Sequence, residues 1–221
     1  MLIKFRFFVK KILAPFNQDT IHLKNCSIHL LRFNGFEPRD YLQHLTAEET
    51  ERFFSFKHLN RQQEFVATRI LRHQLFGFSH IHYNEHGAPF IENEGFISIS
   101  HAPGIVGLAI SREFQIGLDI EPLRPKALLL KDKFLSDDER THFDIHSELE
   151  MTKVWSAKEA LYKLAGRKQI IFKTDLLLKK QSSSIWEGRI INPDAHLKVE
   201  LNIFVQDGCV ITVNDSPILI Q

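Results

Sequence analysis

A short pattern occurs twice in this chain, ninety residues apart, and it constrains the fold more than any other feature. Residues 45–49 match residues 135–139, and both have the hydroxyl-x-x-Glu spacing of a capping box that begins a helix. Further matching pairs are Phe53 with Phe143, Ala67 with Ala157 and, after a one-residue gap, Leu75 with Leu164 and Gly77 with Gly166. The recurrence predicts two lobes of similar design with a ligand cleft between them. Chance agreement of common helix signals is the alternative.

The remaining patterns predict an α+β fold of two similar lobes related by a pseudo-two-fold, each a small, mostly antiparallel sheet with a long packed helix. We place an N-terminal extension at residues 1–25, the N-terminal lobe at residues 26–105 and the C-terminal lobe, with the acidic motifs, at residues 106–221. Long helices are expected from about residue 61 to 76 and through residue 164, each ended by a glycine. The expected strands are residues 26–33, 81–83, 89–91, 96–100, 105–110, 115–120, 170–172, 176–179, 185–191, 196–205 and 209–213.

Composition narrows the class of protein. With 221 residues, 43% hydrophobic and 25% charged, the chain is an ordinary globular one. A formal net charge of +1 gives no general attraction for nucleic acid or membrane, so any anion site must be local. Two cysteines are too few for a secreted disulfide scaffold and indicate a cytoplasmic protein, and no apolar run approaches the ~20 residues of a membrane span.

Basic and apolar residues alternate over residues 1–16. The apolar run is too short and too interrupted for a signal peptide. A basic helix at a membrane interface is one interpretation. We favour the other, an extension that packs its phenylalanines on the body of the protein.

Residues 155–163, Trp-Ser-Ala-Lys-Glu-Ala-Leu-Tyr-Lys, predict a helix with a functional face. The stretch is rich in strong helix formers and free of Gly and Pro until Gly166. Trp155, Glu159 and either Tyr162 or Lys163 lie one turn apart and therefore share one face. The alternative is an ordinary amphipathic helix with a surface Glu159–Lys163 pair.

A second acidic stretch precedes this helix. Asp119 and Glu121 are two residues apart on a predicted strand, so both side chains point to the same side. Adjacent carboxylates repel unless they are solvated or share a cation. With Glu159 as a third carboxylate, they form a hard oxygen site that suits Mg²⁺. A solvated strand face is the alternative for the pair alone.

The strand at residues 96–100 ends in a turn of small residues at 102–104. Ser100 and His101 are placed there to offer a hydroxyl and an imidazole to an anion, although a solvated histidine is the alternative. Three histidines, His80, His82 and His86, have no recognisable zinc-ligand spacing. The chain has neither a Walker loop nor a Gly-x-Ser-x-Gly elbow.

Together these stretches resemble the two-lobed, monomeric 4′-phosphopantetheinyl transferases. The motifs, in the family's order, are Gly-x-Pro at 87–89, Ile-Ser-His at 99–101, Gly-Leu-Asp-Ile-Glu at 117–121, Phe-Leu-Ser-x-x-Glu at 134–139 and the Trp155 helix at 155–163. The resemblance covers roughly residues 27 to 215. It implies a monomer that moves the 4′-phosphopantetheine arm of coenzyme A to a serine of an acyl or peptidyl carrier protein and releases adenosine 3′,5′-bisphosphate. A module that binds coenzyme A or a carrier protein without catalysis is the alternative.

The resemblance also implies roles for individual residues. Asp119, Glu121 and Glu159 would hold Mg²⁺, and Ser100 and His101 would contact the nucleotide phosphates. Glu159 and Lys163 would be catalytic. Both Lys158 and Lys163 would neutralise phosphate charge, Lys163 beside the metal and Lys158, about 100° round the helix, at the edge of the cleft.

One departure from the family concerns the 3′-phosphate of coenzyme A. The family's Gly-x-Pro turn usually carries a lysine in the middle, and this chain has Ala88. Arg61, Arg69 or Arg72 on the preceding helix would have to substitute for it.

Overall fold

The computed structural model describes residues 15–166, 169–192 and 195–220, and it confirms an α+β fold with antiparallel sheets and several helices. In chain order the elements are β1 Phe16–His22, β2 Cys26–Phe33, η1 Pro38–His44, α1 Ala47–Ser55, α2 Leu59–Phe76, β3 His82–Tyr83, β4 Pro89–Phe90, β5 Phe96–Ala102, β6 Ile105–Ser111, β7 Leu118–Pro122, α3 Lys126–Leu130, η2 Lys131–Lys133, α4 Glu139–His142, α5 Glu148–Leu164, β8 Leu176–Lys180, β9 Ile185–Asn192, β10 Ala195–Gln206, β11 Cys209–Asn214 and β12 Leu219–Ile220. None of the helices in these residues is long and apolar enough to cross a bilayer.

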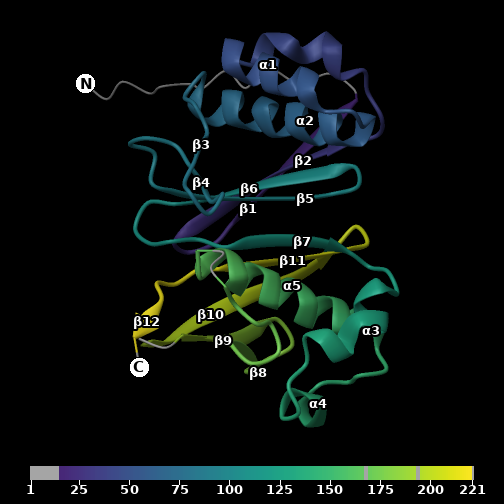
Figure 1. The fold of residues 1–221 in the computed structure, drawn as a ribbon, viewed down its shortest axis with the longest axis vertical. Helices are drawn as coiled ribbons and strands as arrows, with labels where there is room; N and C mark the ends of the chain where they lie inside the picture. The colour runs from purple at the N-terminus through teal and green to yellow at the C-terminus, as the bar shows by residue number, and fades with distance from the viewer. Residues whose placement is uncertain (1–14, 167–168, 193–194, 221) are drawn as a thin grey trace, which may run out of the picture.

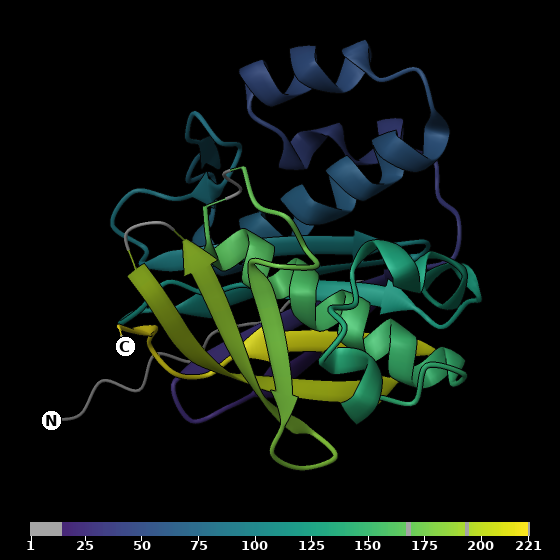
Figure 2. The ribbon, with the colours of Figure 1, turned by 60° about the horizontal axis from the view of Figure 1, so that its bottom comes forward.

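Two sheets are stacked along the long axis of the molecule (Figure 1). The first has the strand order β1-β2-β6-β5, and the second has the order β7-β11-β10-β9-β8, with β12 paired to β10. Helices α1 and α2 lie above the first sheet in Figure 1, and α5 lies against the second, with α3 and α4 near one end of it (Figure 2). The short hairpin of β3 and β4 stands apart as a third, two-stranded sheet.

Three apolar clusters hold these layers together. One lies between α2 and the first sheet and includes Val66 and Leu71. Another lies between α5 and the second sheet and includes Leu161 and Trp186. The third draws residues from both sheets, so the two sheets share a continuous core instead of facing each other across solvent.

Serine side chains join the two sheets where β5 meets β7. Each of these strands is the outer strand of its own sheet, so its outward N–H groups need acceptors. The Ser98 hydroxyl accepts a hydrogen bond from the Leu118 amide at 2.9 Å, and the Ser100 hydroxyl accepts one from the Ile120 amide at 3.0 Å. These bonds fix the register of β7 against the first sheet.

The repeated capping boxes are both formed. Thr46 and Glu49 exchange the reciprocal bonds of a capping box, and so do Ser136 and Glu139. Both glutamates are buried, and each is paired with a cation from the long helix that follows. The cations, Arg69 and Lys158, each lie eight residues before the terminal glycine of that helix, Gly77 or Gly166. The sequence repeat therefore corresponds to a repeated ion pair, while the pseudo-two-fold itself remains a prediction.

The expected boundaries need three corrections. Residues 16–22 belong to the first sheet as β1, so the expected extension at residues 1–25 ends before Phe16; its first fourteen residues lie outside the described part of the chain. Polar residues fill most of β1, so it lacks the apolar pattern of a strand. Strand β6 also belongs to the first sheet and extends that half to Ser111, beyond the boundary at residue 105. Residues 170–172 form no strand; they begin a turn closed by the bond from the Thr174 amide to the Ile171 carbonyl.

Gly117 allows α5 to lie close to the start of β7. A Cβ atom at this position would lie 2.4 Å from the Ala160 carbonyl oxygen, which is backbone and cannot turn aside. At Gly188 a Cβ atom would meet Leu161 Cδ2 at 2.6 Å, the far end of a side chain that can change rotamer.

We expect Gly117→Ala to lower the free energy of unfolding by ~1–3 kcal/mol, the usual cost of overpacking, because the helix must move away from β7. Gly188→Ala is the matched control and should cost less. Chemical denaturation of the two variants measures the difference. An equal or larger loss in Gly188→Ala would show that the α5 backbone does not limit this approach.

Candidate functional site at the contact of β7 and α5

One face of α5 reaches both carboxylates of β7. The Trp155 indole nitrogen donates to Glu121 Oε1 at 2.9 Å. Two turns later, Lys163 Nζ donates to the Leu118 carbonyl at 2.6 Å and to Asp119 Oδ1 at 3.1 Å. Glu159 lies halfway between Trp155 and Lys163 on the same face, so the acidic strand and the acidic helix meet as the sequence predicted.

Ser100 supports Asp119 from the opposite side. Its hydroxyl donates to Asp119 Oδ1 at 3.2 Å while it accepts from the Ile120 amide, and the residue is 5% exposed. Because this buried hydroxyl already donates one hydrogen bond and accepts another, it is poorly placed to contact a nucleotide phosphate. Ser100 therefore orients Asp119, and its direct contact with a nucleotide phosphate stays a prediction.

The carboxylates of β7 retain features that favour a cation. Asp119 Oδ2 is buried and has no hydrogen-bond partner among the described residues, which is costly for a charged oxygen. Burial, followed by the negative charge of Asp119, raises the pKa of the Glu121 carboxyl. A divalent cation would relieve both costs, so the residues present fit a hard, oxygen-bound ion.

Glu159, the third expected metal ligand, does not form a metal-binding cluster with Asp119 and Glu121 among the described residues. No group of three or more His, Cys, Asp and Glu side chains that could hold a metal ion is found in residues 15–166, 169–192 and 195–220. The arrangement instead places the Lys163 ammonium on Asp119. Participation of Glu159 in a metal site is thus a proposal that rests on its helix face.

A polar pocket of about 140 Å³ lies between α2, β5 and the β3–β4 turn. Its lining, which we call the arginine pocket, is Arg52, Arg61, Glu64, Phe65, Thr68, Arg69, Tyr83, Gly87, Pro89, Ile99 and His101. The pocket brings together four features that the sequence singled out, namely the Gly-x-Pro turn, His101, Arg61 and Arg69. Arg52 and Tyr83 were not expected there, since nothing in the sequence shows that α1 and the hairpin meet at this point.

Hydrogen bonds in the arginine pocket fix the form of His101. Arg61 Nη1 donates to His101 Nε2 at 2.9 Å, and His101 Nδ1 lies 3.3 Å from Glu64 Oε2. The bonding indicates a neutral ring with its hydrogen on Nδ1. Burial lowers the pKa of His101, and the neighbouring charge of Arg61 lowers it further, whereas Glu64 opposes both.

The three candidate arginines differ in how free they are. The Arg61 side chain is 47% exposed, lines the pocket and pairs with Glu64 at 3.1 Å. Arg69 is buried, bonded to Glu49 at 3.1 Å and stacked 3.8 Å from the Phe65 ring centre. Arg72 is fully buried and donates to the Gly77 and His44 carbonyls as well as to Glu49, away from the pocket. The pocket is therefore served by Arg61 and the exposed Arg52, with Arg69 as part of its wall.

Lys158 does not lie in the cleft. Its side chain is fully buried and its ammonium donates to the carbonyls of Phe134 and Phe172, at 2.6 and 2.9 Å, and to Glu139 at 2.7 Å. These three bonds use all three ammonium hydrogens. Burial lowers the pKa of Lys158, while Glu139 opposes that shift. The prediction that Lys158 reaches the phosphates at the edge of the cleft is wrong, because the helix rotates this residue into the core.

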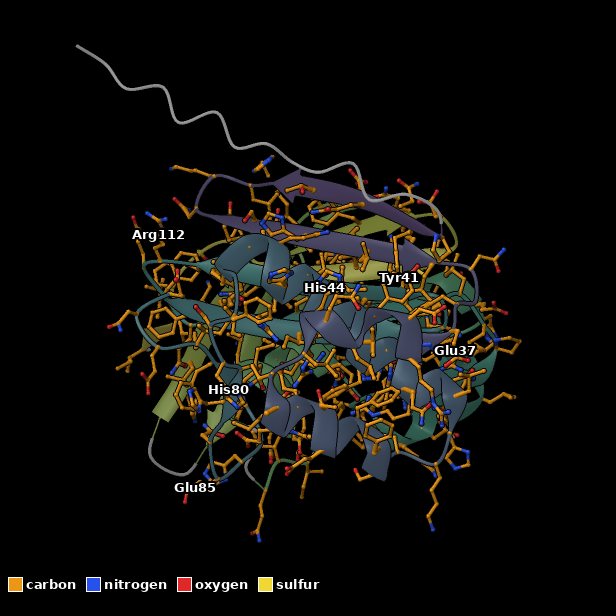
Figure 3. All side chains as sticks on the ribbon, turned by 90° about the horizontal axis from the view of Figure 1, so that it is seen from above. Glu37, Tyr41, His44, His80, Glu85 and Arg112 are labelled. Atoms are coloured by element: carbon orange, nitrogen blue, oxygen red, sulfur yellow. The ribbon has the colours of Figure 1, made fainter. Side chains whose placement is uncertain are left out.

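The histidines considered for zinc lie just before and within the hairpin of β3 and β4. His80 and His82 pack with ring centres 4.7 Å apart, and His86 lies 3.4 Å from Glu85. Figure 3 labels His80 and Glu85 on one side of the helical layer and His44, which bonds His73, nearer its middle. No metal-holding group includes them within the described residues.

Comparison with known proteins supports the resemblance over the second half of the chain. The family profile described as the 4'-phosphopantetheinyl transferase superfamily matches residues 115–213. Two curated proteins, both named 4'-phosphopantetheinyl transferase AcpT, from Escherichia coli O157:H7 and Escherichia coli (strain K12), are each 33% identical over 115 residues. The alignments cover 48% of this chain and 59% of each relative. The profile match includes β7 and α5 but not the arginine pocket.

We expect Lys158→Ala to destabilise the protein by ~3–5 kcal/mol, because it leaves the Glu139 carboxylate buried without its cation. The double variant Lys158→Met/Glu139→Gln should recover part of that loss, since it removes both charges. Thermal and chemical unfolding measure both. If the Lys158→Ala protein were stable and only bound coenzyme A more weakly, Lys158 would have the expected role in the cleft after all.

Proposed function

We propose that this protein transfers the phosphopantetheine arm of coenzyme A to a serine of a carrier protein, because residues 115–213 match the family profile described as the 4'-phosphopantetheinyl transferase superfamily. The observation that carries the proposal is the meeting of β7 and α5, where a buried, unbonded Asp119 oxygen lies beside Glu121 and Lys163. The chain spans less than two thirds of the curated relatives it matches, so activity, substrates and partners are all part of the proposal.

Asp119, Glu121 and Glu159 would hold one Mg²⁺. The ion would supply charge neutralisation for the pyrophosphate of coenzyme A. Lys163, held between the Leu118 carbonyl and Asp119, would add the second positive charge at the same place. Positive charge beside the reacting phosphorus counts most in the transition state, so Lys163 and Glu159 are the proposed catalytic residues.

The arginine pocket would take the nucleotide part of coenzyme A. Its two accessible arginines supply the charge that Ala88 lacks, so Arg61 and Arg52 would hold the 3′-phosphate. The neutral His101, already bonded to Arg61, orients that guanidinium. Arg69 would contribute mainly through the wall of the pocket, because its side chain is buried, stacks on Phe65 and donates from Nε to Glu49.

The proposed reaction replaces the phosphoanhydride bond of coenzyme A with a phosphoester bond to the carrier serine. The carrier serine oxygen attacks the β-phosphorus, the new P–O bond forms, and the bond from that phosphorus to the bridging oxygen of the pyrophosphate breaks. Adenosine 3′,5′-bisphosphate leaves with the bonding electrons, and the serine proton passes to Glu159 or to solvent. The protein's contribution is positioning and charge, since the two phosphates are anionic throughout.

A surface beside Glu121 fits an acidic carrier protein. Leu129 on α3 is 79% exposed, and Arg124 and Lys126 are exposed next to it. An acidic helix with a small apolar patch would match this combination of charge and exposed leucine. Lys131, which follows α3, is turned away from this surface, because its ammonium donates to the Ile145 carbonyl at 2.8 Å.

A non-catalytic module that binds coenzyme A or a carrier protein is the alternative. Mass spectrometry decides between them: candidate apo carrier proteins are incubated with the protein, coenzyme A and Mg²⁺. Transfer adds the mass of one phosphopantetheine arm to the carrier, and binding alone adds none. We further propose that the enzyme is a monomer, acts in the cytoplasm and has no nucleic-acid partner.

We expect Asp119→Asn to lower the transfer rate by more than about 100-fold. Removing a residue that only supports a metal ligand costs up to about that much, and Asp119 is proposed as a ligand itself. The amide keeps an oxygen for Ser100 and Lys163, so the melting temperature should stay close to that of the unaltered protein. Removal of the metal with EDTA should give the same loss. Full transfer by Asp119→Asn would exclude the metal assignment.

We expect Lys126→Glu and Leu129→Ser each to raise the KM for the carrier protein by about five-fold, the equivalent of one exposed contact worth ~1 kcal/mol. The KM for coenzyme A should not change. Arg112→Glu is the control, because Arg112 is exposed in the turn after β6 (Figure 3). Steady-state kinetics with varied carrier concentration measures the effect, and equal KM values in all three variants would place the carrier elsewhere.

A further inference from the structure

In each carboxylate of β7, one oxygen accepts a hydrogen bond from a neighbouring side chain, and the other oxygen is held less tightly. Asp119 Oδ1 accepts from Ser100 and Lys163, and its Oδ2 has no partner among the described residues. Glu121 Oε1 accepts from the Trp155 indole at 2.9 Å, while Arg124 Nη2 lies 3.6 Å from Glu121 Oε2. The two side chains are therefore held in the same way, by donors on one oxygen.

Trp155 is itself held rigidly. Its ring stacks on Phe172 with centres 5.4 Å apart and an interplanar angle of 28°, and it meets Phe134 edge-on at 5.3 Å. The carbonyls of both phenylalanines accept hydrogen bonds from the buried Lys158 ammonium. One cation thus fixes the two residues that clamp the indole.

The hydrogen bond from Trp155 holds Glu121 in place against the repulsion between the Asp119 and Glu121 carboxylates. Glu121 is partly buried beside Asp119, and without a donor on Oε1 its side chain would turn away from that charge toward solvent. Hydrogen-bond donors on ligating carboxylates are known to set the orientation of the oxygen that remains.

We propose that Trp155 is a positioning residue for the metal: its indole N–H fixes Oε1 of Glu121 so that Oε2 is available, with Asp119 Oδ2, to a divalent cation. The inference rests on the proposed function for the presence of the cation. Trp155 touches neither coenzyme A nor the cation in this scheme and acts only through Glu121.

The inference is tested by measuring how tightly the full chain binds Mn²⁺ in the absence of coenzyme A. The electron paramagnetic resonance signal of free Mn²⁺ reports how much of the ion is unbound. We expect Trp155→Phe, which keeps an aromatic ring but removes the N–H, to weaken Mn²⁺ binding by about 10- to 100-fold. Trp186→Phe is the matched control and should bind as the unaltered protein does. Trp186 is fully buried against Phe143, and its indole nitrogen has no partner in the described residues.

A second measurement covers the case in which Trp155→Phe fails to fold. In Trp186→Phe the only indole is Trp155, so Mg²⁺ should shift its fluorescence emission at the concentrations that displace Mn²⁺. Unchanged Mn²⁺ affinity in a folded Trp155→Phe protein, or unchanged emission while Mg²⁺ displaces Mn²⁺, would overturn the inference. If the unaltered protein binds no Mn²⁺, the metal site of the proposed function fails, and the inference falls with it.

Discussion

The position of β7 is the constraint on which the rest of the structure depends. It is the outer strand of the second sheet, yet serine hydroxyls from β5 satisfy its outward amides, and the absence of a side chain at Gly117 lets α5 approach it. One side of the strand thereby contributes Leu118 and Ile120 to the core shared by both sheets. The other side presents Asp119 and Glu121 to the helix. Because the strand is held rigidly, its two neighbouring carboxylates stay close together and do not rotate toward solvent.

Buried ion pairs supply the rigidity behind this contact. Glu139 accepts from the Ser136 and Leu178 amides as well as from Lys158, so one carboxylate joins α4, β8 and α5. Glu49 makes the corresponding link to Arg69 and Arg72 in the other half. Pairs of this kind contribute little net stability but are costly to break, so they specify one arrangement of the helices. The rotation of α5 that aims Trp155 and Lys163 at β7 follows from that specification.

Much of this arrangement was predictable from local patterns. The strand at residues 26–33, the two long helices and the shared face of Asp119 and Glu121 follow from periodicity, capping boxes and terminal glycines. The sequence could not tell which polar residues are buried. Lys158 and Lys163 look alike on a helix, but the partner of Lys158 is Glu139, nineteen residues away, and only packing reveals it. Arg52 was missed for the same reason, because the residues that complete its pocket come from β5 and the β3–β4 turn.

The proposed function requires the contact of β7 and α5 to be a metal site that faces bound coenzyme A. The most direct test is anomalous diffraction from crystals of the protein grown with Mn²⁺ and coenzyme A. We expect one strong manganese peak within coordination distance of Asp119 Oδ2 and Glu121 Oε2, with the 3′-phosphate density in the arginine pocket. A manganese peak away from both carboxylates, or coenzyme A bound outside that pocket, would contradict it.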